Sequence, residues 1–221
     1  MDLKSHSYHK QMIEYYDGAK YSYDWDGVRQ SYIDDEANLS VEQRRTIEQI
    51  QRVFSGRKVL ELAAGGGRWT KHIAQTAKSV LATDTSEQVL AIGRSLVKEA
   101  NVRFVQSDAF KLGQLDERFD AAFHFNFINH LSYSDWPRLM ESLHRKLICG
   151  AVVVMGGQRY RAPESDDGID YYTDRECSDG KRYRLIDNLP DEDQVESVIG
   201  HLVEDLEFAM DNRWWAKYTV L

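Results

Sequence analysis

The residues of this chain best suited to binding chemistry are carboxylates and glycines at the ends of short apolar runs. Glu61 is followed by three glycines at 65–67, and Asp84 and Asp108 each follow a later apolar run. Glycines let backbone N–H groups approach a ligand, and carboxylates accept hydrogen bonds from hydroxyl, amino and ammonium groups. Asp84 can accept from both hydroxyls of a ribose, and Asp108 is placed to accept from an adenine amino group. By itself the glycine turn is equally explained by a tight strand-to-helix connection.

The elements that must position these residues alternate between strand and helix. The strands are too apolar to be half exposed, which is typical of a parallel sheet covered on both faces. Ligands bind such sheets at the carboxyl ends of the strands, where the strand order reverses. A capping box, Ser40 with Gln43, begins one of the helices. We expect strands at 58–62, 79–83, 102–106, 119–125, 151–155, 203–209 and 213–220, with helices starting at Ser40, Thr85, Ser134 and Pro190 and after the glycine turn.

Composition narrows the classes of function. The chain has 221 residues, 42% hydrophobic and 29% charged, and a formal net charge of −8. This acidic balance disfavours nucleic-acid and anionic-membrane partners, which require a basic surface. The two cysteines lack C-x-x-C spacing, no apolar run has bilayer length, and the N-terminus does not look like a leader. These features predict a cytoplasmic protein. A monomer or homodimer is expected. His6 and His9 do not form a metal site with any further ligands, so no metal is expected.

The strand-end residues resemble those of the class I S-adenosylmethionine-dependent methyltransferases of small molecules. Glu61-x-Ala63-x-Gly65-x-Gly67 looks like their first motif, with alanine in place of the first glycine. The resemblance implies a three-layer Rossmann-like α/β sandwich, with a mostly parallel seven-stranded sheet, an antiparallel last strand and an N-terminal helical lid. It implies one domain over 1–221, made of a lid (1–38), a cofactor-binding core (39–156), and a flap with the closing strands (157–221).

The resemblance also implies S-adenosylmethionine as cofactor. The glycines would lie under its methionine part, Asp84 would hold the ribose, and Asp108 with Ala109 or Phe110 would hold the adenine. Lid tyrosines could stabilise the sulfonium by cation–π attraction. The expected cofactor-binding residues are Glu61, Ala63, Gly65, Gly67, Trp69, Asp84, Thr85, Ser107, Asp108, Ala109, Phe125, Asn126, Tyr8 and Tyr16.

Candidate catalytic and acceptor-binding residues follow the fourth strand or lie in the lid and flap. His130 is the first candidate for a general base, against the alternative that it only supports its loop. Asn126 and the adjacent Tyr15 and Tyr16 complete the expected catalytic set, although tyrosines near a chain end are often simple packing residues. The residues expected to bind the acceptor are Tyr21, Asn129, Tyr172 and Arg175, the last as a clamp for a carboxylate.

Three functions remain open from the sequence. The first is methyl transfer to a small molecule by in-line displacement. The second uses the same cofactor without a separate acceptor: its own α-amine attacks the γ-carbon, which forms azetidine-2-carboxylate and releases methylthioadenosine. The third is a cofactor-binding protein without turnover. The acceptor and its reacting atom are not encoded in any motif of the chain.

Overall fold

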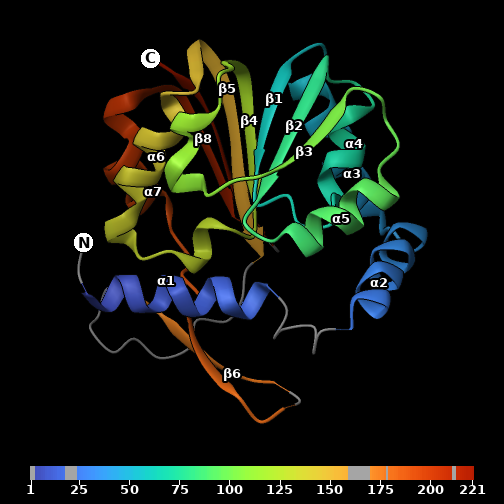
Figure 1. The fold of residues 1–221 in the computed structure, drawn as a ribbon. Helices are drawn as coiled ribbons and strands as arrows, with labels where there is room; N and C mark the ends of the chain where they lie inside the picture. The colour runs from blue at the N-terminus through green and yellow to red at the C-terminus, as the bar shows by residue number, and fades with distance from the viewer. Residues whose placement is uncertain (1–2, 18–23, 159–169, 178, 211–212) are drawn as a thin grey trace.

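The computed structural model describes residues 3–17, 24–158, 170–177, 179–210 and 213–221, with only the backbone over 3–8 (Figure 1). A seven-stranded sheet in the order β3-β2-β1-β4-β5-β9-β8 forms its centre. Strands β1 to β5 are parallel, and β9 is antiparallel to both β5 and β8, which confirms the predicted fold class. The strands are β1 (Lys58–Leu62), β2 (Ser79–Asp84), β3 (Val102–Gln106), β4 (Phe119–Phe125), β5 (Leu147–Gln158), β8 (Val203–Met210) and β9 (Arg213–Val220).

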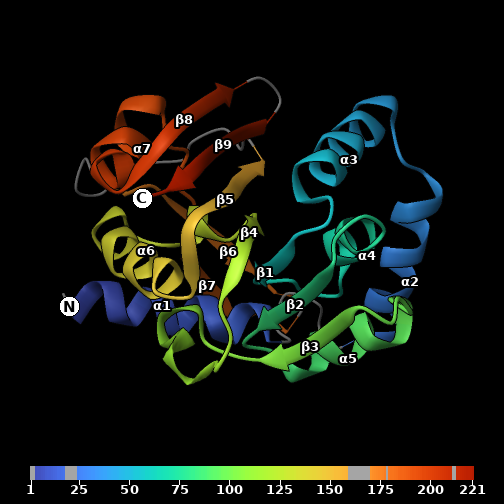
Figure 2. The ribbon, with the colours of Figure 1, turned by 90° about the horizontal axis from the view of Figure 1, so that it is seen from above.

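Helices cover both faces of this sheet (Figure 2). On one face Ile50 and Phe54 pack with Ile73 against β1, β2 and β4, and on the other Leu139 and Leu143 pack within a larger core. These layers arise because the strands are apolar on both sides and each helix buries one stripe. The first face carries α3 (Val41–Phe54), α4 (Arg68–Ala74) and α5 (Glu87–Leu96); the second carries α6 (Trp136–His144) and α7 (Glu192–Ile199).

Short 3-10 turns complete several connections: three of them follow β3 or β4, and the fourth precedes β8. They let the chain change direction within one turn, where no longer helix fits. The third turn leads directly into α6, and the last one leads into β8. The turns are η2 (Ala109–Gln114), η3 (Ile128–His130), η4 (Tyr133–Asp135) and η5 (Gly200–Leu202).

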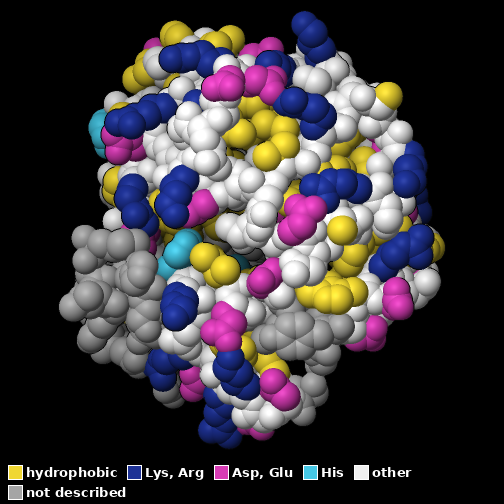
Figure 3. All heavy atoms as spheres, viewed as in Figure 1, with side chains coloured by type: hydrophobic (Ala, Val, Ile, Leu, Met, Phe, Trp, Pro, Cys, Tyr) yellow, Lys and Arg dark blue, Asp and Glu magenta, His cyan; other side chains and the backbone are white. Residues whose placement is uncertain are grey.

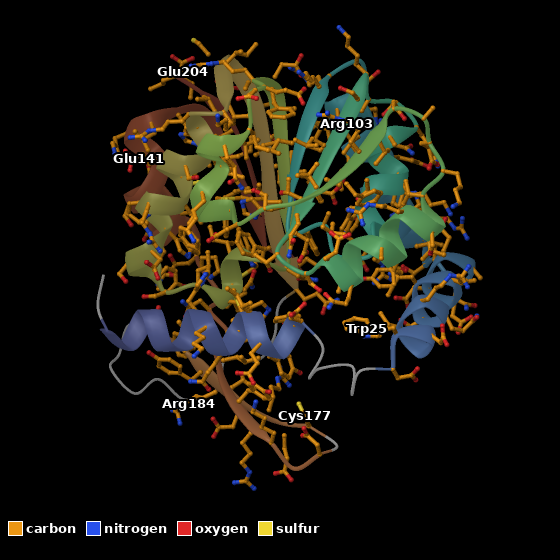
Figure 4. The ribbon with its side chains drawn as sticks, in the orientation of Figure 1. Trp25, Arg103, Glu141, Cys177, Arg184 and Glu204 are labelled. Atoms are coloured by element: carbon orange, nitrogen blue, oxygen red, sulfur yellow. The ribbon has the colours of Figure 1, made fainter. Side chains whose placement is uncertain are left out.

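Two further segments lie beyond the carboxyl ends of the strands. Helix α1 (Leu3–Tyr16) crosses below the sheet in Figure 1, and a two-stranded hairpin of β6 (Tyr172–Glu176) and β7 (Arg182–Ile186) hangs beneath it. Figure 4 shows Cys177 and Arg184 on this hairpin, on the side of α1 away from the sheet. The role of this hairpin as a flap and that of α1 as a lid stay predictions.

Three details differ from the sequence-based expectation. Helix α2 (Trp25–Ala37), capped by Asp24, was not predicted; it buries only Val28, so its apolar pattern is faint. Helix α5 is capped by Ser86, whose hydroxyl accepts from the backbone of Val89, and not by Thr85. Leu147 begins β5 instead of ending α6, because it pairs in register with Phe119. The predicted residues 160–169 of the flap lie outside the described residues.

The surface is mixed in charge. On the face shown in Figure 3, basic and acidic side chains alternate and neither sign forms a broad patch. None of the helices in the described part of the chain combines the length and the hydropathy needed to cross a membrane.

His124 in β4 makes the stability of the fold sensitive to acid. Its side chain is fully buried, and among the described residues neither ring nitrogen has a hydrogen-bond partner. Burial lowers the pKa of His124 to about 3. The unfolded chain binds this proton below an ordinary pKa of about 6.5, while the folded chain binds it only near pH 3. The contribution of His124 to stability is therefore lost progressively as the pH falls below about 6.5, by about 1.4 kcal/mol per pH unit.

We expect His124→Leu to remove this acid sensitivity. The free energy of unfolding of the variant, relative to the wild type, should rise by about 2 kcal/mol between pH 7 and pH 5. Urea denaturation at both pH values measures the difference. His201→Gln, at an exposed position, is the matched control. Its free energy of unfolding should change with pH in parallel with that of the wild type. Parallel curves for His124→Leu as well would show that His124 does not resist protonation.

Candidate functional site

A cavity of about 450 Å³ lies at the carboxyl ends of β1 to β4. Its walls come from the turn after β1, the ends of β2 and β4, the segment after β3, and helices α1 and α2. This is the point where the strand order reverses between β1 and β4, the usual ligand position in an open α/β sheet. The cavity is of a size typical for small-molecule sites.

The glycine turn is shaped by left-handed backbone and by its packing against neighbours. Ala63, Gly65 and Gly67 have φ values of 51°, 55° and 82°. Glycine adopts such values without steric cost, whereas alanine does so with strain. Gly67 faces away from the cavity, since a Cβ there would lie 2.8 Å from a methyl group of Val97. Ala63 and Gly65 line the cavity, and Gly67 lets the turn pack on α5.

Asp84 lies beside this turn and lines the cavity. Its Oδ2 accepts from the backbone N–H of Gly65 at 2.9 Å and its Oδ1 from that of Ser86 at 3.0 Å. Burial raises the pKa of Asp84, and these backbone N–H groups oppose the increase. Each carboxylate oxygen can accept a second hydrogen bond, so the predicted ribose contact remains available.

The segment after β3 supplies the expected adenine side. Ser107, Asp108, Ala109 and Phe110 all line the cavity. Asp108 Oδ1 accepts from the backbone N–H of Phe110 at 2.9 Å, which holds the carboxylate at the start of the 3-10 turn. Ser107 is buried, and its hydroxyl has no partner among the described residues. A buried hydroxyl without a partner is costly, so Ser107 offers a polar contact to a ligand.

Aromatic residues and Asn126 close the cavity beside β4. Trp69 packs against Phe125 with ring centroids 5.2 Å apart, and both line the cavity with Thr85 and Asn126. Asn126 has a φ of 54°, and its side-chain oxygen accepts from the backbone N–H of Gln158 at 2.7 Å. That hydrogen bond fixes the loop after β4.

Helix α1 has two distinct faces. Residues at positions 9, 12, 13 and 16 share the cavity face, as the 3.6-residue period requires. The face toward the hairpin carries Glu14, which pairs with Lys181, and Tyr15, whose ring lies 5.5 Å from that of Tyr183. Met12, Ile13 and Tyr16 therefore face the cavity together. Tyr15, expected among the catalytic residues, instead packs against the hairpin, because adjacent helical residues point in different directions.

His130 and Tyr16 form the pair that this cavity brings together. Tyr16 Oη lies 2.8 Å from His130 Nε2, and His130 Nδ1 lies 2.8 Å from the carbonyl oxygen of Ile186. A carbonyl oxygen only accepts, so Nδ1 carries the proton. In the neutral ring Nε2 is then an acceptor, and Tyr16 donates to it. His130 thereby links α1, the loop after β4 and the hairpin.

Helix α2 adds site residues that the sequence interpretation missed. Tyr32 and Asp35 line the cavity, and the backbone N–H of Gly66 donates to Tyr32 Oη at 3.1 Å. Arg68 also lines the cavity and pairs with Asp35 at 3.1 Å. The spacing Val28-x-x-x-Tyr32, after the helix cap Asp24, was the only signal available for this contribution.

Other predicted residues lie elsewhere in the described structure. Asn129 is buried and packs against the end of β5. A Cβ on Gly157 would lie 2.3 Å from the side-chain oxygen of Asn129. Arg175 pairs with the buried Asp187 at 3.6 Å instead of facing the cavity. Tyr172 is buried in the hairpin, with Arg184 over its ring. The Tyr8 side chain and Tyr21 lie outside the described residues.

Comparison with known proteins finds a family match over part of the chain. Residues 59–150 match the model of a family described as "Methyltransferase domain". This segment contains the glycine turn, Asp84 and Asp108. This segment is similar to the methyltransferase-domain family, and the whole chain shares its fold with solved methyltransferase structures.

Relatives extend this methyltransferase likeness. The DhpI–SAH complex has the same fold, with a TM-score of 0.74, 23% identity and coverage of 97% of this chain and 98% of that chain. A phosphoethanolamine N-methyltransferase of Triticum aestivum is 32% identical over 117 residues, 52% of this chain and 23% of its own length. The UbiE C-methyltransferase of Pseudomonas fluorescens (strain Pf0-1) is 33% identical over 97 residues, 39% of this chain and 38% of its own length. The chain thus spans less than half the length of these two curated relatives.

The lining of the cavity fits a cationic nucleoside. The described lining residues include three acids, Asp35, Asp84 and Asp108, against one arginine, Arg68. The unpartnered hydroxyl of Ser107 supplies a further polar contact. Nowhere in the described residues do three histidine, cysteine or acidic side chains gather as a metal site.

Glu61 lies behind the turn and outside the cavity lining. It shares a face of β1 with Val59, and its Oε2 accepts from the hydroxyl of Thr70 at 2.6 Å. Burial raises the pKa of Glu61 to about 8, the Thr70 hydrogen bond opposes this increase, and Asp84 adds to it. The first acid of the motif therefore supports α4 against β1, and the folded chain keeps it protonated up to about pH 8.

This protonation predicts a pH dependence of opposite sign to that of His124. The folded state retains the Glu61 proton up to about pH 8, whereas the unfolded state releases it near pH 4.5. Stability attributable to Glu61 therefore falls as the pH rises through this window. We expect the free energy of unfolding of Glu61→Gln, relative to that of the wild type, to rise by about 2.5 kcal/mol between pH 5.5 and pH 7.5. Denaturation at both pH values measures this difference. A constant difference would mean that Glu61 ionises like an exposed acid.

Proposed function

We propose that this chain is an S-adenosylmethionine-dependent methyltransferase acting on a small molecule. The observation that carries the proposal is the acid-lined cavity at the carboxyl ends of β1 to β4. Helix α1 lines this cavity and crosses beyond the carboxyl ends of the strands (Figure 1), which favours a small acceptor over a polymer. In this proposal residues 1–38 serve as lid, 39–156 as cofactor-binding core and 157–221 as flap with the closing strands.

The cofactor would be held by residues from three strand ends. Asp84 would accept from the ribose hydroxyls, Ser107 and Asp108 would contact the adenine, and Trp69 would face the aliphatic part. Acidic side chains favour a cationic ligand, and a partly dehydrated cavity strengthens that attraction. When bound, S-adenosylmethionine supplies a methyl group already activated by the adjacent sulfonium. The protein therefore needs only to align the acceptor, exclude water and take up a proton.

The proton acceptor would be His130, acting through Tyr16. The acceptor molecule would donate to Tyr16 Oη while Tyr16 donates its own proton to His130 Nε2. The bond from Nδ1 to the carbonyl of Ile186 keeps the ring in the tautomer that can accept this proton. Both side chains line the cavity and are already hydrogen-bonded to each other.

The relatives support the reaction class without giving the acceptor. A DhpI–SAM–HEP complex and SAM-bound CalS10, an amino pentose methyltransferase of Micromonospora echinaspora, share the fold with TM-scores of 0.69 and 0.64. The curated relatives carry names of N- and C-methyltransferases. The acceptors in the names of these relatives differ in kind, so none of them is assigned to this chain.

The test is the identity of the nucleoside product. The protein is incubated with S-adenosylmethionine alone and with a mixed panel of small hydroxyl, amine and thiol compounds, and products are identified by mass spectrometry. We expect S-adenosylhomocysteine that depends on the panel. Methylthioadenosine from the cofactor alone would instead support intramolecular cyclisation. Cofactor binding without either product would favour a non-catalytic role.

A further inference from the structure

The backbone donors of the glycine turn are already used within the protein. The N–H of Gly65 donates to Asp84 Oδ2 at 2.9 Å, and that of Gly66 to Tyr32 Oη at 3.1 Å. The N–H of Gly67 donates to the carbonyl of Ala64 at 3.0 Å. A turn that binds phosphate must direct such N–H groups at the ligand. Here all three are directed at protein acceptors.

Tyr32 covers the turn as well as accepting from it. A Cβ on Gly66 would lie 2.6 Å from the Tyr32 ring, and one on Gly65 would lie 3.1 Å from the Tyr32 hydroxyl. The ring therefore rests directly on the turn. Asp24 caps the start of α2, which carries Tyr32, and the Arg68–Asp35 ion pair joins the later part of α2 to α4. Helix α2, which lies outside the sheet, thus holds Tyr32 against the turn.

The charge around the turn also opposes an anion. Asp84 contacts Gly65 directly and has no ion-pair partner among the described residues, whereas Asp35 is paired with Arg68 and Asp108 with Lys111. The cationic side chain of the lining, Arg68, is paired with Asp35. A phosphate in this position would lie beside a carboxylate in a partly dehydrated site, which costs several kcal/mol of repulsion in general. A sulfonium in the same position would be attracted.

We propose that Tyr32 and Asp84 close the glycine turn to phosphate, so that the cavity selects adenosine bearing sulfur on its 5′ carbon and rejects 5′-phosphorylated adenine nucleotides. Tyr32 removes one donor and covers the turn, and Asp84 removes another donor and adds a negative charge. Because AMP and S-adenosylmethionine share the adenosine half, these two residues determine specificity at the 5′ position. This inference rests on the proposed function.

The test compares three probes by calorimetry: S-adenosylhomocysteine, adenosine and AMP. The wild type should bind adenosine on the order of a hundredfold more tightly than AMP. Asp84→Asn keeps the shape of the side chain and should reduce the preference for adenosine over AMP, the ratio of their affinities, about tenfold. Tyr32→Ala uncovers Gly66 and should reduce it similarly. Tyr32→Phe frees the N–H of Gly66 but keeps the ring over the turn, so it should lower the preference for adenosine over AMP by less than Tyr32→Ala does.

Tyr133→Phe is the matched control, since Tyr133 bonds to Gln194 outside the cavity lining; it should leave all three affinities unchanged. This inference alone is overturned if the wild type binds S-adenosylhomocysteine and, in separate titrations, binds AMP with an affinity within tenfold of its affinity for adenosine. A ratio unchanged in Asp84→Asn and Tyr32→Ala overturns the role of these residues. Failure of both adenosine and S-adenosylhomocysteine to bind overturns the proposed function and the inference with it. If Tyr32→Ala does not fold, the isosteric Asp84→Asn decides the outcome.

Discussion

Replacing His130 with asparagine should lower the turnover number by roughly a hundredfold to ten-thousandfold, the range of a lost general base. The asparagine amide can still donate to the carbonyl of Ile186, so the link to the hairpin is kept while the acceptor Nε2 is removed. Binding of S-adenosylhomocysteine should change less than about threefold, because its predicted contacts lie elsewhere in the cavity. Steady-state kinetics with any acceptor that the wild type methylates, together with calorimetry, measures the two effects separately.

Tyr16→Phe provides the matched test, since it removes only the hydroxyl between the acceptor and His130. Its loss in turnover should be comparable, and the double variant should be little worse than either single variant, as residues acting as a unit are not additive. A reduction of less than tenfold, or additive losses, would show that His130 only supports its loop.

Gly67→Ala should destabilise the protein by about 3 kcal/mol. Gly67 has a φ of 82°, where alanine is strained, and the new Cβ would lie 2.8 Å from Val97 and 3.2 Å from the ring of Phe104. Left-handed strain contributes about 1–2 kcal/mol and overpacking a similar amount. Thermal unfolding should shift downward by roughly 10 °C for a chain of this size.

Gly150→Ala separates the two contributions to this effect. Gly150 has a φ of 80°, and a Cβ there meets nothing within 4 Å. Only the backbone strain then remains, partly offset by the lower entropy of the unfolded chain, so we expect a loss of about 1 kcal/mol. Equal losses at both positions would mean that the turn does not pack tightly against α5 and β3.

The sheet and most of the residues proposed to hold the nucleoside could be predicted from the sequence. Buried parallel strands are continuously apolar, and the residue after each strand must lie at the same edge of the sheet. Asp84, Ser107 and Asp108 were therefore located by strand position alone, and they do line the cavity. The capping box at Ser40 similarly fixed the start of α3.

The contributions from outside the sheet could not be predicted in the same way. Helix α2 buries only Val28, so nothing in its pattern showed that Tyr32 reaches the glycine turn. Glu61 was expected to face the ligand, but alternation along β1 turns it toward Thr70. Tyr15 and Tyr16 were equivalent in the sequence, and only the position of α1 decides which of them meets His130.

Calorimetric titration with S-adenosylhomocysteine, comparing the wild type with Asp84→Ala, tests the central claim most directly. The claim is that the cavity at the carboxyl ends of β1 to β4 holds the cofactor. The wild type should bind one molecule per chain, and Asp84→Ala should weaken binding at least about tenfold, because a charged hydrogen bond is worth about 1.5–3 kcal/mol. Absence of binding by the wild type, or equal binding by the variant, would contradict the claim.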